Sequence, residues 1–384
     1  MQAPLDPLAA VVHADPYPYY ATLVDGPALS RDDRLGLWIA ARASTVTAVL
    51  THPACAVRPL AEPVPAVIAG SPVGTIYGAM VRFNDGARHD SLKQTLSDTL
   101  AVLDVAEVRH RSRQLAQTLA GELRPHTSRP ALVEFIVRLA PSVVATMLGA
   151  PAGQLRDVAR WTSAFVAATA PGPSAAVVRD GASAAERLTE HGRAWATRDG
   201  WLARLARDAR AHDRDRVVAN GLGLLWQAYD ATAALIGNTL IALGRLPDVP
   251  ADHAMTRIVA EVARHDAPVQ NTRRFLTVDA VLGGERLNRG DVVLVVLAAA
   301  NRDPAANADP ARFDPSRPSP AVFTFGHGPH ACPGATLATT IATAGVETLL
   351  SLGVAPAALA REVVYRPSLN IRMPRFDPDP AAES

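Results

Sequence analysis

A loop of ten residues near the C-terminus constrains this chain more than any other feature. Residues 325–334 place one cysteine, Cys332, among three glycines and two prolines. Gly326 and Gly334 allow the backbone to turn tightly and to approach a flat surface closely. Pro333 suits the first turn of a helix, and the run that follows is helical in pattern. The positive end of that helix would favour a thiolate at Cys332.

A thiolate on a rigid loop that faces a planar group is the protein's half of a cysteine-ligated haem. Two other interpretations remain open at this point, a buried structural cysteine in a glycine-rich turn and a catalytic thiol. Phe325 would pack beside the thiolate and limit its exposure, which would tune the redox potential of the bound iron. His327 and His330 lie three residues apart, but no further ligand is near them, so no separate metal site is expected.

Composition sets the broad class of the protein. The chain has 384 residues, 48% of them hydrophobic, and length alone suggests two or three domains. A net charge of +1 gives no reason to expect nucleic acid or an anionic membrane as a partner. The two cysteines, one of them needed as a ligand, argue against a disulfide and fit a reducing compartment.

No segment predicts membrane insertion or export. Residues 1–20 contain Asp6, Asp15 and four prolines, which does not fit a signal peptide or an anchor. The longest apolar run, residues 217–246, carries two asparagines, a glutamine and an aspartate, which is too polar for a spanning helix. We therefore expect a soluble, cytoplasmic protein.

The loop also carries a family resemblance. Its pattern Phe-Gly-x-Gly-x-His-x-Cys-x-Gly resembles the haem-binding loop of cytochromes P450 at every fixed position. The resemblance implies haem b (iron protoporphyrin IX), with Cys332 as the iron ligand, His330 bonded to a propionate, and Phe325, Gly326 and Gly334 around the haem. It implies a mainly α fold with a small β region, in which the haem lies between the long central helix and the cysteine loop. It also implies a single domain over residues 1–384.

A second motif resembles the family's propionate-binding helix start. In residues 84–93, Asp85, His89 and Leu92 match the family pattern Asp-Pro-Pro-x-His-x-x-Leu-Arg, and Lys93 stands where arginine is usual. His89 and Lys93 are four residues apart and share one helix face. Two donors on one face suit an anionic propionate, although lysine lacks the two-pronged geometry of arginine. The other interpretation is a solvated basic face.

The longest uninterrupted helical pattern, residues 217–243, resembles the family's central helix. The run Leu-Ile-Gly-Asn at 235–238 sets the register, so Asp230 takes the acid position and Ala231 replaces the usual threonine. In the family, the acid and the alcohol order water and deliver protons during oxygen activation. Thr232 is one residue further on, about 100° around the helix, and would point away. An alternative register places Thr232 in the alcohol position but loses the acid.

Behind the haem, a Glu-x-x-Arg pair resembles the family's structural scaffold. Glu261 and Arg264 are three residues apart on a helix and share a face. The segment around Arg312 resembles the one that supplies a second arginine, so these three residues would form a buried, bidentate network that holds the cysteine loop. Arg274 matches a further propionate ligand, with Arg273 as the fallback.

Several residues are expected to line the substrate pocket. The segment 59–78, rich in proline, glycine and small apolar residues, predicts a long loop over the substrate. Helices are predicted over 43–51 and through 105–210, with breaks at Pro125, Pro130, Pro151 and around Pro171, and a strand over 36–40. The pocket candidates on these and the central elements are Ile76, Tyr77, Phe165, Gln227, Ala228, Tyr229, Val269, Gln270 and Asn271.

These resemblances imply a monooxygenase that oxidises a small or medium natural product with O2. Electrons would come in trans from a ferredoxin and a ferredoxin reductase, and the substrate would be either free or attached to a carrier protein. Because Ala231 replaces the threonine, atypical chemistry is an alternative: ring coupling, cyclisation, nitration or oxidation driven by peroxide. A non-catalytic haem protein is a second alternative.

Overall fold

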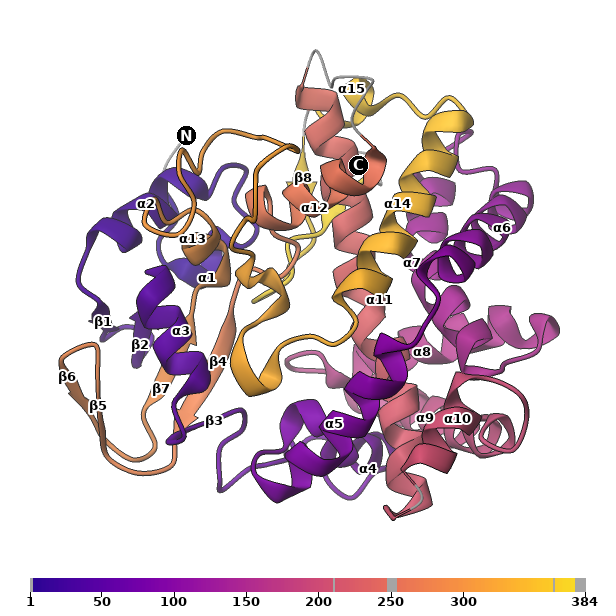
Figure 1. The fold of residues 1–384 in the computed structure, drawn as a ribbon, viewed down its shortest axis with the longest axis horizontal. Helices are drawn as coiled ribbons and strands as arrows, with labels where there is room; N and C mark the ends of the chain where they lie inside the picture. The colour runs from indigo at the N-terminus through magenta and orange to yellow at the C-terminus, as the bar shows by residue number, and fades with distance from the viewer. Residues whose placement is uncertain (1–2, 210, 247–253, 362, 377–384) are drawn as a thin grey trace. The chain divides into compact units, whose positions relative to one another are not determined.

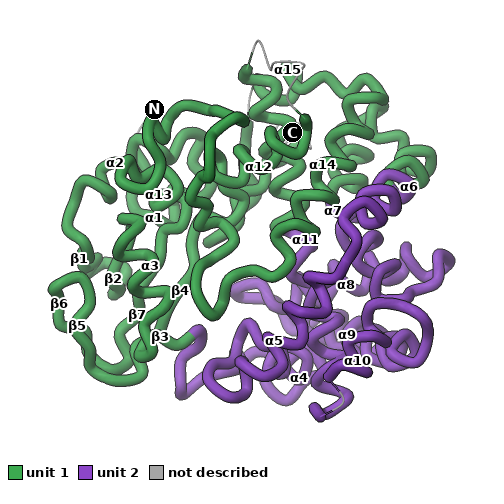
Figure 2. The backbone as a smooth tube through the Cα atoms, in the orientation of Figure 1, with its two compact units in different colours: residues 1–56, 116–136, 231–384 green, residues 57–115, 137–230 purple. Residues whose placement is uncertain are grey.

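The computed structural model describes residues 3–209, 211–246, 254–361 and 363–376. The chain forms two compact units, coloured separately in Figure 2. Unit 1 comprises Met1–Ala56, Ala116–Ile136 and Ala231–Ser384, and unit 2 comprises Val57–Leu115 and Val137–Asp230.

Three helices run through the boundaries between these units in the chain. They are α6 (Val105–Leu123), α7 (Arg129–Leu148) and α11 (Arg214–Arg245). The prediction of a single domain over residues 1–384 stays a prediction. Within the described residues, α7 alone has the length and apolar character of a membrane span, and 61% of its most apolar window is buried, as in a core helix.

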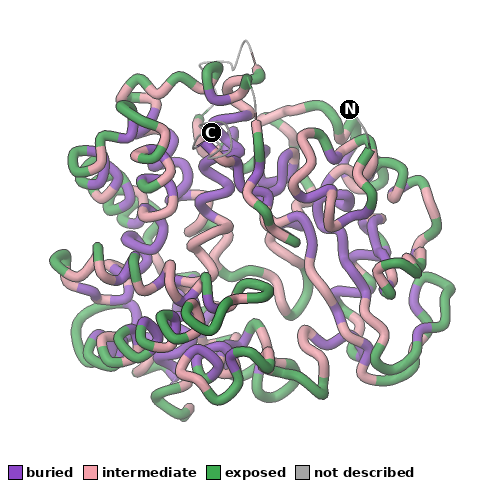
Figure 3. The backbone as a smooth tube through the Cα atoms, turned by 180° about the vertical axis from the view of Figure 1, so that it is seen from behind, coloured by how far each residue is buried: buried purple, intermediate pink, exposed green. Residues whose placement is uncertain are grey.

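A five-stranded sheet organises unit 1 (Figure 1). Its order is β1-β2-β7-β4-β3, and only the β2–β7 pair is parallel. Side chains alternate between its two faces, so Val293 and Val295 pack towards α3 while Leu294 and Val296 pack towards α2. Both faces are therefore covered, and the central strands are mostly buried (Figure 3). The bounds are β1 Leu29–Asp32, β2 Leu37–Ala40, β3 Cys55–Ala56, β4 Thr272–Leu276 and β7 Val292–Val295.

Two small hairpin sheets complete the β structure. The turn between β5 (Ala280–Leu282) and β6 (Glu285–Leu287) is Gly283-Gly284, with φ of +57° and +88°. Both angles lie in the left-handed region that glycine enters without strain, as a two-residue hairpin requires. The other pair is β8 (Val364–Tyr365) with β9 (Pro374–Arg375).

Helices make up most of the remaining structure, so the expected mainly α fold with a small β region is confirmed. The other helices of unit 1 are α1 Pro7–Ala10, α2 Tyr17–Asp25, α3 Ala43–Thr51, α12 Met255–His265, α13 Leu297–Asn301, α14 Ala335–Ser351 and α15 Pro356–Leu359. Those of unit 2 are α4 Pro72–Ala79, α5 Ala87–Ala101, α8 Leu155–Thr169, α9 Ala175–Trp195 and α10 Trp201–Asp208. Single 3-10 turns are η1 Val81–Phe83, η2 Ala152–Gln154, η3 Phe323–Phe325 and η4 Gly328–His330.

The segment 59–78 is not a loop throughout, and the prediction is wrong for its second half. Helix α4 begins at Pro72, where the Ser71 hydroxyl accepts a hydrogen bond from the Gly74 N–H. Gly74 lowers helix propensity, but a Cβ there would lie 2.2 Å from the Ile68 carbonyl oxygen. The glycine therefore permits close packing of the preceding loop on the helix. The pattern also marked Pro130 as a break, whereas Pro130 lies in the first turn of α7.

Candidate functional site

Cys332 is presented on a loop between η4 and α14. The Cys332 N–H donates to the Phe325 carbonyl oxygen over 2.7 Å, and the Ala331 N–H donates to that of Gly328 over 2.9 Å. Gly334 is the N-cap residue of α14. The Cys332 side chain is exposed, two residues before the cap. The loop thus holds a thiol at the amino end of a 17-residue helix, where the helix dipole favours negative charge.

The second cysteine lies in a different environment. Cys55 is buried in β3, and this burial raises the pKa of its thiol to about 11, although the charge of Arg274 acts in the opposite direction. A thiol with such a pKa stays protonated at neutral pH and is a poor thiolate ligand. Neither cysteine takes part in a disulfide within the described residues. Of the two, Cys332 is the one with the exposure that a ligand requires.

The conformation of the loop depends on two of its glycines. Gly326 and Gly328 have φ of +73° and +68°, in the left-handed region. A Cβ at Gly328 would lie 2.6 Å from Thr51 Cγ2 on α3. The glycine therefore allows η4 to pack directly against α3.

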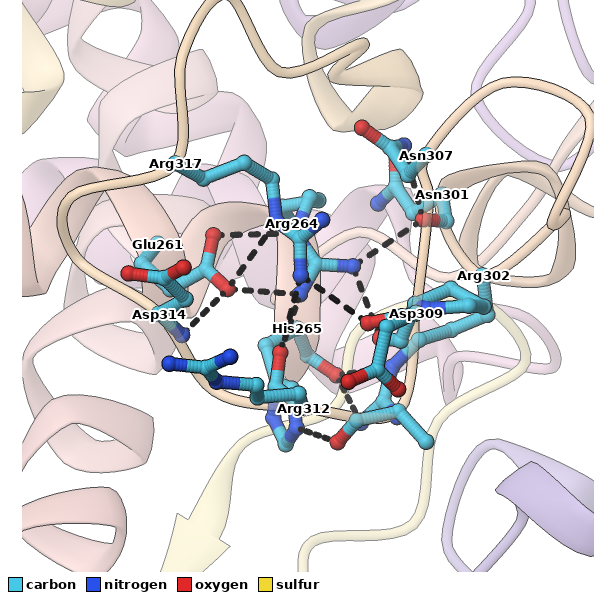
Figure 4. A network of polar contacts seen from close by, with 12 residues as sticks. Glu261, Arg264, His265, Asn301, Arg302, Asn307, Asp309, Arg312, Asp314 and Arg317 are labelled. Carbon is cyan, nitrogen blue, oxygen red and sulfur yellow. Dashed lines mark hydrogen bonds and ion pairs between the residues drawn. The ribbon is translucent and has the colours of Figure 1, made fainter.

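Glu261 and Arg264 form a buried ion pair on α12, as their spacing in the sequence predicted. Arg264 donates from Nη2 to Glu261 Oε1 over 2.6 Å and from Nε to Oε2 over 2.9 Å (Figure 4). The Arg264 side chain is 0% exposed, and its remaining donors reach the carbonyl oxygens of Asn301, Pro310 and Arg312. All five N–H groups of the guanidinium can thus be satisfied, as a fully buried arginine requires.

The prediction that the Arg312 side chain takes part in this network is wrong. Arg312 joins the network through its backbone carbonyl oxygen, while its side chain is exposed. The second arginine at Glu261 is Arg317, with Nε 3.7 Å from Oε1. The Asp314 N–H also donates to Oε1, so the chain turns after residue 312 and brings residue 317 back to the carboxylate. Figure 4 shows both arginines beside Glu261 and Arg264.

Two residues that sequence reasoning did not assign link this scaffold to the cysteine loop. The Thr324 hydroxyl in η3 donates to the Ala263 carbonyl oxygen on α12. Asn301 donates from Nδ2 to the Thr324 hydroxyl over 2.9 Å and accepts from the Phe323 N–H over 2.6 Å. Asn301 lies in the run Ala300–Pro304, which also resembles the P450 family in sequence, and that resemblance is the signal that could have identified it. The α12 scaffold is thereby bonded to the turn directly before Gly326.

The predicted propionate contacts fall in both units. In unit 1, Arg274 lies on β4, is 5% exposed, and donates from Nη1 to the Arg273 carbonyl oxygen. His330 is half-buried in η4. In unit 2, His89 and Lys93 share one face of α5, and Nδ1 of the buried His89 lies 2.8 Å from Asp90 Oδ1. Their common role at a propionate stays a prediction.

The middle of α11 differs in exposure from its flanks. Residues 226–231, which include Gln227, Ala228, Asp230 and Ala231, are all half-buried, whereas the flanking turns are mostly buried. Thr232 is 2% exposed and opens the buried stretch that follows. The side chain at position 231 is therefore more accessible than that of Thr232. This fits the register in which Ala231 takes the alcohol position.

The pocket candidates in unit 2 separate into different environments. Ile76 and Phe165 line one small cavity of about 10 Å³, together with Trp226. Tyr77 stacks on Phe83 with 3.9 Å between ring centroids. The Tyr229 hydroxyl lies 3.0 Å from the Ser163 hydroxyl oxygen, and Gln227 donates to the Gly223 carbonyl oxygen. The structure thus brings Ile76 and Phe165 together, while the pocket roles of all six candidates in this unit, Ala228 included, stay predictions.

Gln270 does not have the exposure expected of a pocket residue. Its side chain is fully buried, accepts from the Tyr20 hydroxyl over 2.8 Å and donates to the Ala267 carbonyl oxygen over 2.6 Å. These bonds contradict the predicted pocket role, because both ends of the amide are used inside unit 1. Asn271 is also buried, and it donates to the Leu369 carbonyl oxygen. Val269 forms an isolated bridge to Ile371.

A second buried ion pair was not predicted. Asp266, at the end of α12, accepts from Arg372 Nε over 2.8 Å and from the Tyr17 hydroxyl over 2.6 Å. Arg372 is 1% exposed, and its other nitrogens donate to the carbonyl oxygens of residues 11, 13 and 14. Burial acts to raise the pKa of the Asp266 carboxyl, but Arg372 and the Tyr17 hydroxyl outweigh it and lower that pKa. This pair fastens the N-terminal segment to α12.

Comparison with known proteins identifies the family. Residues 248–352 match the cytochrome P450 family model. The chain is 30% identical over 381 residues to the cytochrome P450 monooxygenase PikC of Streptomyces venezuelae, covering 94% of this chain and 89% of that protein. The chain belongs to the cytochrome P450 family. The 6-deoxyerythronolide B hydroxylase of Saccharopolyspora erythraea is another relative of this P450, 29% identical over 315 residues, or 75% of this chain and 74% of that protein. The crystal structure of CalO2 is similar in fold, with a TM-score of 0.77, 28% identity and coverage of 97% of each chain.

The expected cofactor and enzyme class are thereby confirmed, because P450s are oxidoreductases that bind iron protoporphyrin IX. The residues of this P450 fit that group. Among the described residues, no cluster of three or more His, Cys, Asp or Glu side chains can hold a metal ion. The exposed Cys332 thiol can supply one ligand to an iron whose other ligands come from a porphyrin.

Proposed function

We propose that the thiolate of Cys332 would hold the haem iron in this P450 monooxygenase. The observation that carries this proposal is the exposed thiol on a glycine-shaped loop that is bonded back to α12 through Thr324. When bound, the haem supplies the reductive activation of O2 and the oxidation of the substrate. The chain's own contribution is to hold the thiolate in place and to stabilise its negative charge at the start of α14.

The proposal assigns the cationic side chains to the haem propionates. The residues assigned to this role are Arg274, His330, His89 and Lys93. Arg274 supports this role because it is a buried cation on β4, and a buried cation gains from an anion bound beside it. Lys93 would act as a point charge, because its ammonium group cannot form the two-pronged contact of an arginine.

Proton delivery would begin at Asp230. Its carboxylate lies in the half-buried section of α11, where it can exchange protons with water. Ala231 carries no hydroxyl, so the next proton donor would be an ordered water or a hydroxyl of the substrate. The pocket would be lined in unit 2 by Ile76, Phe165 and the side of α11 that carries Gln227 and Tyr229.

The substrate class that we propose is a small or medium natural product. Support comes from relatives of this chain that are named for such substrates, among them the 6-deoxyerythronolide B and erythromycin C-12 hydroxylases of Saccharopolyspora erythraea. Electrons would come from a separate ferredoxin and its reductase in the cytoplasm. The substrate would be taken up either free or on a carrier protein.

The ligand assignment is tested by the spectrum of the ferrous–CO complex. The wild type should show the Soret position typical of a thiolate ligand, Cys332→Ser should lose it, and the matched control Cys55→Ser should keep it. A Cys332→Ser protein that binds haem and retains the thiolate spectrum would refute the assignment. A panel of natural products should then be screened for a high-spin shift of the ferric Soret band.

A second candidate function is favoured by one observation, the alanine at position 231. Without the hydroxyl, this P450 would favour a reaction that depends less on proton delivery, such as ring coupling, cyclisation, nitration or oxidation by peroxide. Product analysis separates the two functions. One oxygen atom from isotope-labelled O2 inserted per turnover, with two electrons consumed, supports the monooxygenase. A coupled or cyclised product without added oxygen, a nitro product, or turnover with peroxide in place of O2 and electrons supports the alternative.

A further inference from the structure

Unit 1 contains a groove of about 800 Å³ that no haem or substrate residue discussed above lines. Its walls come from α2, the last turn of α11, the end of α12 and the segment that follows α13. The lining is largely apolar, with two aromatic rings and three prolines: Tyr17, Phe313, Pro18, Pro304 and Pro310. The size and lining are those of a small-molecule site.

Two arginines line this groove, the exposed Arg245 and the half-buried Arg302, and the guanidinium of Arg302 is only partly bonded. Its Nε and Nη2 both donate to the His265 carbonyl oxygen, over 2.9 and 2.6 Å. Its guanidinium carbon lies 4.0 Å from the centroid of the Tyr17 ring. Because both bonds go to one oxygen atom, they use one edge of the guanidinium. The edge formed by Nη1 and the second N–H of Nη2 has no partner among the described residues.

Within the described residues, no carboxylate forms an ion pair with Arg302. The two acids whose charges act on it from a distance, Asp266 and Glu261, are each paired with another arginine. Burial lowers the pKa of the Arg302 guanidinium, which expresses the cost of keeping the cation out of water. An anion on the open edge would offset that cost and could bind through two parallel hydrogen bonds.

The other side chains of the groove narrow the class of anion. Asp15 and Asp25 line it near the two ends of α2 and would repel a polyanion such as a nucleotide. The His265 ring donates from Nε2 to the Ala311 carbonyl oxygen and packs edge-on against Phe313, with 5.3 Å between ring centroids. These neutral rings and the prolines suit a flat apolar body.

We propose that this groove binds a carboxylic acid with an aromatic body, its carboxylate on the open edge of Arg302 and its ring system beside His265 and Phe313. The site is separate from the haem chemistry. It would therefore serve an effector or a second copy of an acidic substrate or product, and its occupancy does not depend on Cys332.

The test uses the haem-loaded protein and sodium 2-naphthoate as the probe, with binding followed by equilibrium dialysis. Ala21 is exposed and lines the groove, so Ala21→Trp fills it without touching Arg302 or the core. Thr22 is exposed beside it but does not line the groove, so Thr22→Trp is the matched control. We expect saturable binding of one naphthoate per chain, weakened about tenfold or more by Ala21→Trp and unchanged by Thr22→Trp.

Two further measurements test the proposed contact between the carboxylate and Arg302. The neutral analogue 2-naphthamide should bind about tenfold or more weakly than naphthoate, and Arg302→Lys should weaken naphthoate because lysine lacks the second donor. Three results would each overturn the proposal: no saturable binding by the wild type, equal affinity of the two tryptophan variants, or equal affinity for the acid and the amide. The Soret band is recorded in the same titration. A Soret shift that follows naphthoate occupancy in both tryptophan variants would place the probe at the haem and also overturn the proposal.

Discussion

Asp266 and Arg372 are 106 residues apart in the sequence, and the Arg372 Nε lies 2.8 Å from Asp266 Oδ1 inside unit 1. The guanidinium also covers the Tyr365 ring, with 3.6 Å from its carbon to the ring centroid, and holds three carbonyl groups of the N-terminal segment. The Asp266 carbonyl oxygen in turn accepts from Nδ2 of the buried Asn238 on α11. One arginine therefore joins the N-terminal segment, the C-terminal hairpin and the end of α12.

Arg372→Leu should destabilise this P450 by about 3–5 kcal/mol, because it leaves the buried Asp266 carboxylate without its cation. The free energy of unfolding is measured by urea denaturation of the haem-loaded protein. The double variant Asp266→Asn, Arg372→Leu should recover part of the loss, since it removes the stranded charge. A single variant with wild-type stability would show that the pair contributes nothing.

Acidification should destabilise the fold through His265. Burial, aided by the charge of Arg302, lowers the pKa of this imidazole to about 4, against an unfolded value of about 6.5. Between these values the unfolded chain binds a proton that the folded chain does not, so stability falls as pH drops through this window and is fully present above it. His265→Gln can still donate to the Ala311 carbonyl oxygen and does not titrate. Its stability should vary less between about pH 6.5 and 4 than that of the wild type, and identical slopes would contradict the prediction.

Arg317 should matter more than Arg312. Arg317→Ala removes a mostly buried cation that lies 3.7 Å from Glu261, and should cost about 1–3 kcal/mol. Arg312→Ala keeps the backbone carbonyl group that Arg264 uses, so its effect should stay within about 0.5 kcal/mol. Urea denaturation and the rate of haem loss would be compared for the two variants. A larger effect of Arg312→Ala would restore the role that the sequence assigned to it.

Gly328→Ala tests the close packing of the cysteine loop. The matched control is Gly36→Ala, because Gly36 has nearly the same φ, +67° against +68°, but open space where a Cβ would stand. The control should lose only the backbone cost, about 1 kcal/mol, whereas Gly328→Ala should lose more and release haem faster. Thr51→Ser removes the methyl group in the way and should restore part of the loss. Equal losses in the two alanine variants would mean that the packing on α3 is unimportant.

Once a substrate has been identified, Ala231→Thr should change the fraction of electrons that is lost as hydrogen peroxide. The added hydroxyl would stand one residue after Asp230, at the position that is half-buried rather than in the core. Thr232→Val serves as the comparison, because it removes the neighbouring buried hydroxyl at nearly constant volume. An unchanged coupling ratio in Ala231→Thr together with a changed one in Thr232→Val would favour the other register of α11.

The sequence patterns correctly predicted the features that depend only on residues close together in the chain. The spacing of Glu261 and Arg264 placed both on one helix face, and the helix over 43–51 has the predicted bounds. The patterns failed for contacts that depend on how the chain turns and on which distant residues it brings together. Whether Arg312 or Arg317 reaches Glu261 depends on the turn after residue 312, and the Asp266–Arg372 pair has no local signal at all. Gln270 was predicted to line the pocket because its segment should pass close to the haem and the substrate. Its amide oxygen instead accepts a hydrogen bond from Tyr20, 250 residues away.

The hydrogen bonds of Arg264 also have a consequence for sequence variation. Three of them end on carbonyl oxygens, those of Asn301, Pro310 and Arg312, and a carbonyl oxygen is present whatever side chain the residue carries. The segment around residues 310–312 can therefore change its side chains over evolutionary time without loosening the scaffold, provided that the length and course of its backbone are kept. Insertions and deletions there should be selected against far more strongly than substitutions.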